Sequence, residues 1–201
     1  MNIRCLPTGP MRANCYIVWG ENDIDCAVID PGWDAVLIQD LLDEEELRLR
    51  HIFLTHLHYD HVGAVDALRT PDTMVWYCKA EIENGGAAMS RGMMDFSLPM
   101  TDYDEGDEIE VGSLRFRVLR TPGHSFGSVT LYSSGCLFTG DTLFAGSVGR
   151  TDLPGGNPDW LANSLRRLTS MDPRMSIFPG HGGPSTLDIE IHKNPFLGDI
   201  L

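Results

Sequence analysis

Four apolar, strand-like runs in this 201-residue chain end in the same way. Each run stops directly before a histidine or an aspartate, or leads into one through a short turn that contains glycine. Strands that end at one edge of an α/β sheet bring together the residues behind them, and such edges are where these sheets assemble their sites. The polar residues that follow the four runs are His56, His58, Asp60, His61, His124, Asp141 and His181.

These seven side chains suit metal binding. Zinc and similar divalent ions take imidazole nitrogens and carboxylate oxygens, and a catalytic zinc keeps three protein ligands and one water. Seven donors are too many for one tetrahedral ion and match two ions that share a bridging carboxylate. His56 and His58 are two residues apart in extended backbone, so they point the same way and can chelate one ion. Asp60 and His61 can face a neighbouring ion.

The rest of the pattern predicts an α/β chain that forms one domain over residues 1–201. Helical spacing of apolar residues predicts a helix over 33–47, with Val36, Leu37, Leu41 and Leu42 on its buried face, and a second helical stretch with Val62, Val65 and Leu68. A third helix is expected at 159–169. The expected strands are 14–19, 26–30, 51–55, 73–78, 114–120, 128–133, 136–139 and 175–178.

Composition excludes several classes of partner. The chain has 15 Lys and Arg against 29 Asp and Glu, a net charge of −14, and so lacks the basic face that nucleic acids require. The same deficit disfavours an anionic membrane surface, and no apolar stretch approaches the ~20 residues that span a bilayer. The start has no apolar signal segment, and the five cysteines are scattered without a CxxC pair. We therefore expect a cytoplasmic protein that binds neither nucleic acid nor membrane.

The order of the motifs resembles the metallo-β-lactamase superfamily. Residues 55–61 (THLHYDH) match its HxHxDH signature, and His124, Asp141 and His181 match its later ligand motifs in order. The resemblance covers nearly the whole chain and implies an αββα sandwich, an α/β fold in which two mixed sheets are flanked by helices. It also implies that His56, His58 and His124 bind a first metal ion, that Asp60, His61 and His181 bind a second, and that Asp141 bridges them.

Within this superfamily the chain resembles glyoxalase II-like hydrolases. Residues 138–144 (FTGDTLF) and 146–152 (GSVGRTD) look like that branch. True β-lactamases usually lack the bridging aspartate, so Asp141 argues against antibiotic hydrolysis. Typical glyoxalase II enzymes carry a C-terminal helical domain that grips glutathione, and an acidic residue and a tyrosine after the last histidine. Here only 20 residues follow His181, starting with glycines and a proline. The resemblance thus implies a compact, single-domain branch without the glutathione-binding helical domain.

For such a site we expect hydrolysis of a small acyl ester or thioester. Two cations held ~3.5–4 Å apart can share a water and lower its pKa from about 15.7 to about 7. A metal-bridging hydroxide would then attack the carbonyl carbon, and Asp60 would orient the hydroxide besides binding the second ion. The expected cofactors are two divalent ions, zinc in first place, with iron or manganese accepted by the same ligands.

Three other functions stay open. A persulfide dioxygenase shares these motifs but uses one iron, held at the positions of His56, His124 and Asp141. The complete second ligand set, including His181, favours hydrolysis over that reaction. Lactone hydrolysis is served by similar ligands. A metal-binding protein that has lost catalysis is disfavoured because all seven ligand residues are present.

Several residues near the motifs carry two interpretations. Asp30, at a strand exit, is either a turn residue or a support for the ligands. Residues 150–152 either support ligands or form an ion pair within a loop. The Met-rich segment 89–100 suits a substrate-facing lid, a loosely packed core flank or a subunit contact. His51 and His192 are expected to be polar loop residues without a ligand role.

Overall fold

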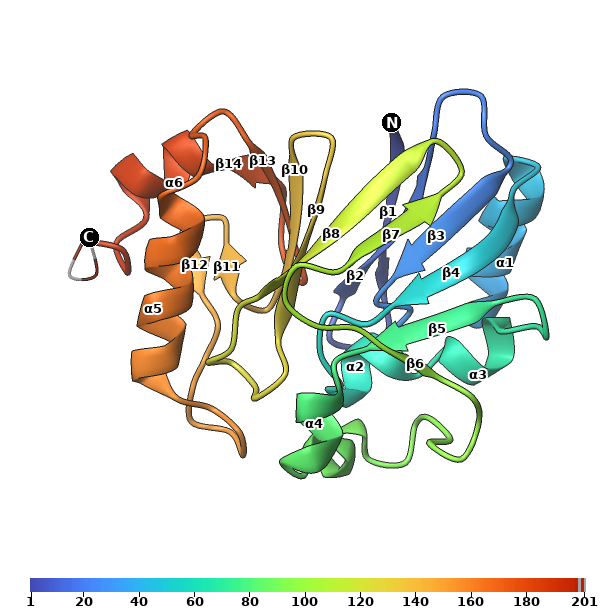
Figure 1. Ribbon diagram of the computed structural model, residues 1–201, viewed down its shortest axis with the longest axis horizontal. Helices are drawn as coiled ribbons and strands as arrows, with labels where there is room; N and C mark the ends of the chain where they lie inside the picture. Colours follow the sequence, from blue (N-terminus) through green and yellow to red (C-terminus); the bar gives the residue numbers. More distant parts are fainter. Residues whose placement is uncertain (199, 201) are drawn as a thin grey trace.

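Two six-stranded sheets lie at the centre of the structure, with helices on their outer faces (Figure 1). The computed structural model describes residues 1–198 and residue 200. The first sheet has the order β1-β2-β3-β4-β5-β6 and is antiparallel from β1 to β3 and parallel from β3 to β6. Its strands are β1 (Asn2–Thr8), β2 (Ala13–Trp19), β3 (Asp25–Ile29), β4 (Arg48–Phe53), β5 (Met74–Tyr77) and β6 (Thr101–Asp102).

The second sheet has the order β14-β13-β10-β9-β8-β7. Only β10 and β13 pair in parallel, and the other neighbours are antiparallel. A separate two-stranded hairpin, β11 (Leu143–Phe144) with β12 (Ser147–Val148), follows β10. The strands of the second sheet are β7 (Glu108–Val111), β8 (Leu114–Arg120), β9 (Val129–Ser133), β10 (Cys136–Gly140), β13 (Ser176–Pro179) and β14 (Ser185–Thr186).

The helices cover the two outer faces. Helices α1 (Ala35–Glu44) and α3 (Val65–Leu68) lie against the first sheet, and α5 (Pro158–Thr169) and α6 (Leu187–Lys193) lie against the second (Figure 1). Three short helical segments, α2 (Tyr59–Val62), α4 (Lys79–Glu83) and η1 (Gly86–Ser90), lie near the edge where β4 ends. These layers confirm the expected αββα sandwich. Among the described residues, no helix is long and apolar enough to cross a membrane.

Strand β2 explains why the layers hold together. All seven of its residues are buried, so both of its faces are covered. Because successive side chains of a strand point to opposite faces, Cys15 and Ile17 join the cluster beneath α1 and α3, whereas Tyr16 and Val18 join the cluster between the sheets. A third apolar cluster packs α5 against the second sheet. Three layers of core thus lie between four layers of secondary structure.

The N-terminal helix differs from its prediction in length and in its buried face. Helix α1 ends at Glu44, and its buried residues are Ile38 and Leu42. Val36 and Leu37, predicted to face the core, are 75% and 48% exposed. The residues one helical turn apart, 38 and 42, form the inner stripe, so the expected face was rotated by about one position.

Other elements also differ from the sequence pattern. The second helical stretch forms two short helices, α2 and α3, instead of one, although its apolar residues at 62, 65 and 68 are buried as expected. Strand β1 was not predicted. Its side chains are mostly half-buried or exposed, because it is the edge strand of the first sheet, and it carries Pro7. An edge strand of this kind gives little alternation in the sequence.

The ends of β4, β8, β10 and β13 meet at one edge of the sandwich, as the four sequence runs predicted. Backbone hydrogen bonds tie these ends together. Val129 N donates to Thr55 O (2.9 Å), which joins β9 of the second sheet to the end of β4 in the first. Gly180 N donates to Gly140 O (2.8 Å), which joins the exits of β13 and β10. The loops behind these strands are therefore held at fixed positions relative to one another.

Candidate metal centre

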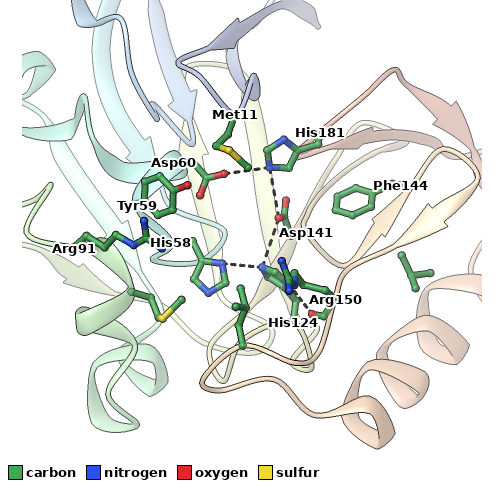
Figure 2. A pocket seen from close by; sticks show the side chains of 13 residues that line it. Met11, His58, Tyr59, Asp60, Arg91, His124, Asp141, Phe144, Arg150 and His181 are labelled. Atoms are coloured by element: carbon green, nitrogen blue, oxygen red, sulfur yellow. Dashed lines mark hydrogen bonds and ion pairs between the residues drawn. The ribbon is translucent and has the colours of Figure 1, made fainter.

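A cavity of about 420 Å³ opens at this edge. Figure 2 shows side chains from four strand exits pointing into it. His58 and Asp60 come from the segment after β4, His124 from the loop after β8, Asp141 from the end of β10, and His181 from the loop after β13. His56 and His61 lie deeper and are fully buried. All seven residues predicted from the sequence are thus brought together.

Three histidines form the first group. Ring nitrogens of His56, His58 and His124 lie within 4.8 Å of one another, and His124 Nε2 lies 2.9 Å from His58 Nδ1. His124 Nδ1 donates to the carbonyl oxygen of Arg150 (2.9 Å). The Nε2 atom of His124 therefore carries a lone pair and faces the other two rings.

The second group consists of Asp60, His61 and His181. Asp60 Oδ2 lies 3.3 Å from His181 Nε2 and 3.8 Å from His61 Nε2. His61 Nδ1 donates to Asp30 Oδ2 (3.1 Å), and its Nε2 atom faces the carboxylates of Asp60 and Asp141.

Asp141 lies between the two groups. Its Oδ2 atom is 3.5 Å from His124 Nε2 in the first group and 3.6 Å from His181 Nε2 in the second. Its Oδ1 atom is 3.5 Å from His61 Nε2. Gly180 makes room for this carboxylate, because a Cβ at that position would lie 2.2 Å from Asp141 Oδ1. One carboxylate therefore contacts both groups.

The donor atoms fit metal ions better than they fit one another. Two ligands about 2.1 Å from a shared tetrahedral ion lie about 3.4 Å apart, and the contacts around Asp60 and Asp141 span 3.3 to 3.8 Å. Most of these are too long for good hydrogen bonds. At this site four buried atoms have no hydrogen-bond partner within the described residues: the Nε2 atoms of His56, His58 and His61, and Asp141 Oδ1. Buried polar atoms rarely lack a hydrogen-bond partner. Divalent ions bound to these four atoms would take the place of such partners.

Electrostatics distinguish the two groups. Burial, with neighbouring histidines, holds the pKa of His56 well below its usual value and lowers the pKa of His58 to about 3, so both rings are neutral ligands at neutral pH. Burial also lowers the pKa of His61, but Asp141, Asp30 and Asp60 outweigh it and raise that pKa to about 9. The second group therefore favours positive charge, which a divalent ion would supply.

Asp30 supports both groups from behind. Its carboxylate accepts hydrogen bonds from Thr55 N (2.8 Å), Thr55 Oγ1 (2.6 Å) and His61 Nδ1 (3.1 Å). Because the Thr55 hydroxyl gives its proton to Asp30, its oxygen can accept from His56 Nδ1 (3.1 Å) and leave His56 Nε2 free to bind. Asp30 is 2% exposed and has a positive φ of 52°. Of its two interpretations, the support for ligands is the one observed.

The other ambiguous residues divide as follows. Arg150 and Asp152 form an exposed ion pair, with Nε–Oδ1 and Nη2–Oδ2 distances of 2.6 and 2.7 Å, so the support for His124 comes from the backbone of Arg150. In the Met-rich segment, Met94 is core and Met89 lines the cavity. His192 is exposed on α6, whereas His51 lies in β4, half-buried, and accepts from Trp76 Nε1 (2.9 Å). Neither histidine lies in a loop, so that prediction was wrong for both, whereas the expected strand over 51–55 did include His51.

Several residues that line the cavity had not been singled out in the sequence as site residues. Tyr59, Arg91 and Phe144 line the cavity together with the ligand groups (Figure 2). Tyr59 stands inside the HxHxDH motif, and Phe144 stands three residues after Asp141, so both could have been found by their place next to ligands. Arg91 reaches the cavity from η1, and no local pattern indicates this.

Residues 8–181 match the family model described as the metallo-beta-lactamase superfamily. The chain belongs to this superfamily. Among curated members, the probable metallo-hydrolase YqgX of Bacillus subtilis (strain 168) is 35% identical, with 98% of each chain covered. Hydroxyacylglutathione hydrolase GloC of Haemophilus influenzae is 32% identical, again with 98% of each chain covered. Superfamily membership and these named hydrolases support a metal-dependent hydrolase.

Solved structures of the superfamily agree with the fold. The crystal structure of BLEG-1 B3 metallo-beta-lactamase superimposes with a TM-score of 0.89 at 34% identity and covers 98% of this chain and all of that one. TTHA1623 in a di-iron-bound form gives 0.84 at 38% identity, with 96% and 100% covered. ETHE1 from Myxococcus xanthus gives 0.83 at 30% identity, with 97% and 84% covered.

Proposed function

We propose that this protein is a dinuclear metal hydrolase that cleaves a small acyl ester or thioester. The observation that carries the proposal is the position of Asp141, whose Oδ2 atom lies 3.5 Å from a nitrogen of the first group and 3.6 Å from a nitrogen of the second. In the proposal His56, His58 and His124 hold one ion and Asp60, His61 and His181 hold the other. Asp141 bridges the two.

Divalent ions bound by these residues would supply a water of lowered pKa and a positive charge near the carbonyl oxygen of the substrate. The protein's own residues do the rest. Asp60 lies at the cavity edge, and burial would raise the pKa of its carboxyl, but His181 and His61 outweigh burial and lower it to about 2. Asp60 is therefore ionised at neutral pH and can accept a hydrogen bond from the attacking water. A thiolate or alkoxide leaving group needs no further acid from the chain.

The choice of a thioester rests on the relatives. GloC is named a hydroxyacylglutathione hydrolase, and this chain covers 98% of its length. YqgX is named only as a probable metallo-hydrolase, which agrees with the reaction class and leaves the substrate open. We infer that the described fold serves as one catalytic domain and that an additional domain is not needed for thioester cleavage.

The proposal names zinc as the first candidate for both ions, with iron or manganese as alternatives. A superfamily neighbour is described in a di-iron-bound form, so iron is a serious competitor in this fold. Imidazole and carboxylate ligands accept all three metals, and availability in the cell decides among them. All five cysteines are free thiols, which agrees with the reducing cytoplasm that we propose as its compartment.

A second candidate is a mononuclear iron dioxygenase acting on persulfides, because ETHE1 is among the structural neighbours. Such an enzyme needs only the positions of His56, His124 and Asp141. The observation against it is the second group, in which His181 Nε2 approaches Asp60 Oδ2 to 3.3 Å and completes a second set of ligand atoms.

One experiment separates these functions. The metal content of the purified protein is measured, and the protein is assayed with S-lactoylglutathione, a lactone, a β-lactam and a persulfide. Oxygen uptake is recorded in each assay. We expect two metal ions per chain and thioester cleavage without oxygen uptake. One iron with oxygen uptake would establish the dioxygenase, and β-lactam or lactone cleavage alone would reassign the substrate. A metal-loaded protein inactive on the whole panel would contradict an enzymatic role.

A further inference from the structure

Two arginines line the cavity, and they differ in their partners. The Arg150 guanidinium is held by both oxygens of Asp152. The Arg91 guanidinium lies over the Tyr59 ring, 4.3 Å from its centroid. Within the described part of the chain, no carboxylate lies within ion-pair distance of Arg91. Its positive charge is therefore open to the cavity, in a protein whose net charge is −14.

Arg91 is held in place from two directions. Its backbone N–H donates to Ala88 O (3.3 Å) at the end of η1, and this turn keeps the residue at a positive φ of 52°, an unfavourable value for a residue with a Cβ. Its guanidinium stacks on Tyr59, which stands between His58 and Asp60 in the chain. A guanidinium stacked on an aromatic ring keeps its N–H groups free to bind another partner. The cation therefore faces the space next to the ligand groups.

The remaining walls of the cavity are apolar. Phe144 lies beyond His181, across the cavity from Arg91 and Tyr59, and Met11 lies between Asp60 and His181 (Figure 2). Met89, Val148 and Leu153 add further apolar side chains to the lining. The cavity thus offers ligand atoms at its base, apolar contacts along its sides, and one unpaired cation on one wall.

We propose that Arg91, stacked on Tyr59, binds a carboxylate of the substrate, so that the preferred substrates are acyl esters or thioesters bearing a carboxylate. This rests on the proposed hydrolase function. A guanidinium matches a carboxylate in charge and in its two-pronged geometry. We favour a carboxylate over a phosphate because the single unpaired cation on this wall balances one negative charge.

Matched substrates test the proposal. The first pair is the succinyl thioester of N-acetylcysteamine, which carries a carboxylate on the acyl side, and the methyl ester of that carboxylate, which is uncharged. The second is the acetyl thioester of 3-mercaptopropionate and its methyl ester, which place it on the thiol side. A third substrate is an acetyl thioester whose thiol carries a phosphate in place of the carboxylate. The wild-type protein is expected to prefer the acid in one of the first two pairs, and Arg91→Gln is expected to reduce that preference about ten- to a hundredfold.

Controls separate binding from folding. Arg117→Gln removes an exposed arginine of β8 outside the cavity and is expected to leave the preference intact. Tyr59→Phe keeps the ring and is expected to retain most of the preference, whereas Tyr59→Leu is expected to lose it. An equal loss on acid and methyl ester in Arg91→Gln, no acid preference in the wild type, or a preference for the phosphate-bearing substrate would overturn the proposal.

Binding gives a readout that does not depend on turnover. Calorimetry with the metal-loaded protein compares a non-hydrolysable thioether acid of the preferred pair with its methyl ester. We expect Arg91→Gln to weaken binding of the acid about tenfold or more and to weaken binding of the ester by less. An acid that binds the variant as tightly as the wild type coordinates the metals directly and contradicts the role of Arg91. Absence of turnover on any thioester, with Arg91-dependent binding retained, refutes the proposed function alone.

Discussion

The two groups of candidate ligands differ in charge and in exposure. The first consists of three buried histidines, and burial keeps the pKa of His56 and His58 low. The second contains a carboxylate, and its His181 side chain is 28% exposed. In the proposed dinuclear site, the first ion would therefore be enclosed by neutral nitrogens. The second would be bound by opposite charge close to solvent, where an ion exchanges more readily.

The largest effect is expected where the two groups meet. Asp141→Ala removes the carboxylate that contacts both, so we expect loss of metal from both positions and a fall in kcat/KM of more than about a hundredfold. Mutation of a residue that only orients a metal ligand already lowers metal affinity or activity about 10- to 100-fold. Elemental analysis and a thioester assay measure both quantities. A variant that kept two metals and full activity would remove the bridging role.

The next largest effect is expected when a ligand is removed from only one of the two groups. His181→Ala takes the exposed ligand from the second group and is expected to leave one ion per chain, with activity reduced about a hundredfold, since one ion cannot clamp both oxygens of the reaction. His56→Ala is expected to deplete the first position instead. His192→Ala, an exposed histidine on α6, is the matched control and should bind two ions. Retention of both ions, or loss of both, in the His181 variant would abolish the distinction between the groups.

A smaller effect is expected from the support behind the second group. Asp30→Asn keeps the shape of the side chain but removes the charge that accepts from His61 Nδ1 at 3.1 Å. We expect metal affinity at the second position to fall about tenfold or more, as is usual for residues that orient a ligand histidine. Chelator titration followed by elemental analysis measures it. Asp152→Asn, in an exposed ion pair, is the control, and equal affinities in the two variants would show that Asp30 is only structural.

The sequence predicted the ligand residues better than it predicted what supports them. His56, His124, Asp141 and His181 each follow an apolar run, and a run of that kind is local information. The contacts of Asp30 with Thr55 and His61 join residues 25 and 31 positions apart in the chain. The place of Asp30 at a strand exit allowed a supporting role, but it did not show which residues Asp30 contacts.

The fold follows the same rule. The strands that are buried on both faces, such as β2, were predicted within one residue, because a long apolar run has one structural solution. The edge strand β1 and the buried face of α1 were missed or misplaced, because their patterns depend on which neighbour covers them. Arg91 belongs with these cases, since its position over Tyr59 depends on how η1 packs against α2.

The smallest effect concerns the loop that carries His124 in the first group. Glu81 of α4 is 1% exposed and accepts from Ser125 Oγ and from Gly127 N (3.0 Å), on the C-terminal side of His124. Burial raises the pKa of Glu81 more than these hydrogen bonds lower it. The folded state therefore holds the Glu81 proton more tightly than the unfolded chain does. The stabilisation from this carboxyl is complete below about pH 4.3, its pKa in an unfolded chain, and is lost as pH rises through the raised pKa of the folded state.

Glu81→Gln removes this titration, because the amide stays neutral at every pH. We expect the free energy of unfolding of the variant, relative to wild type, to improve as pH rises from 4 to 7, as measured by urea unfolding of the metal-free proteins. Glu83→Gln, exposed on the same helix, should show no such trend. If the variant and wild type differ by a constant amount across this range, Glu81 is ionised in both states and its hydrogen bonds compensate for burial. The loop that carries His124 would then be supported by a charged carboxylate, as His61 and, through Thr55, His56 are supported by Asp30.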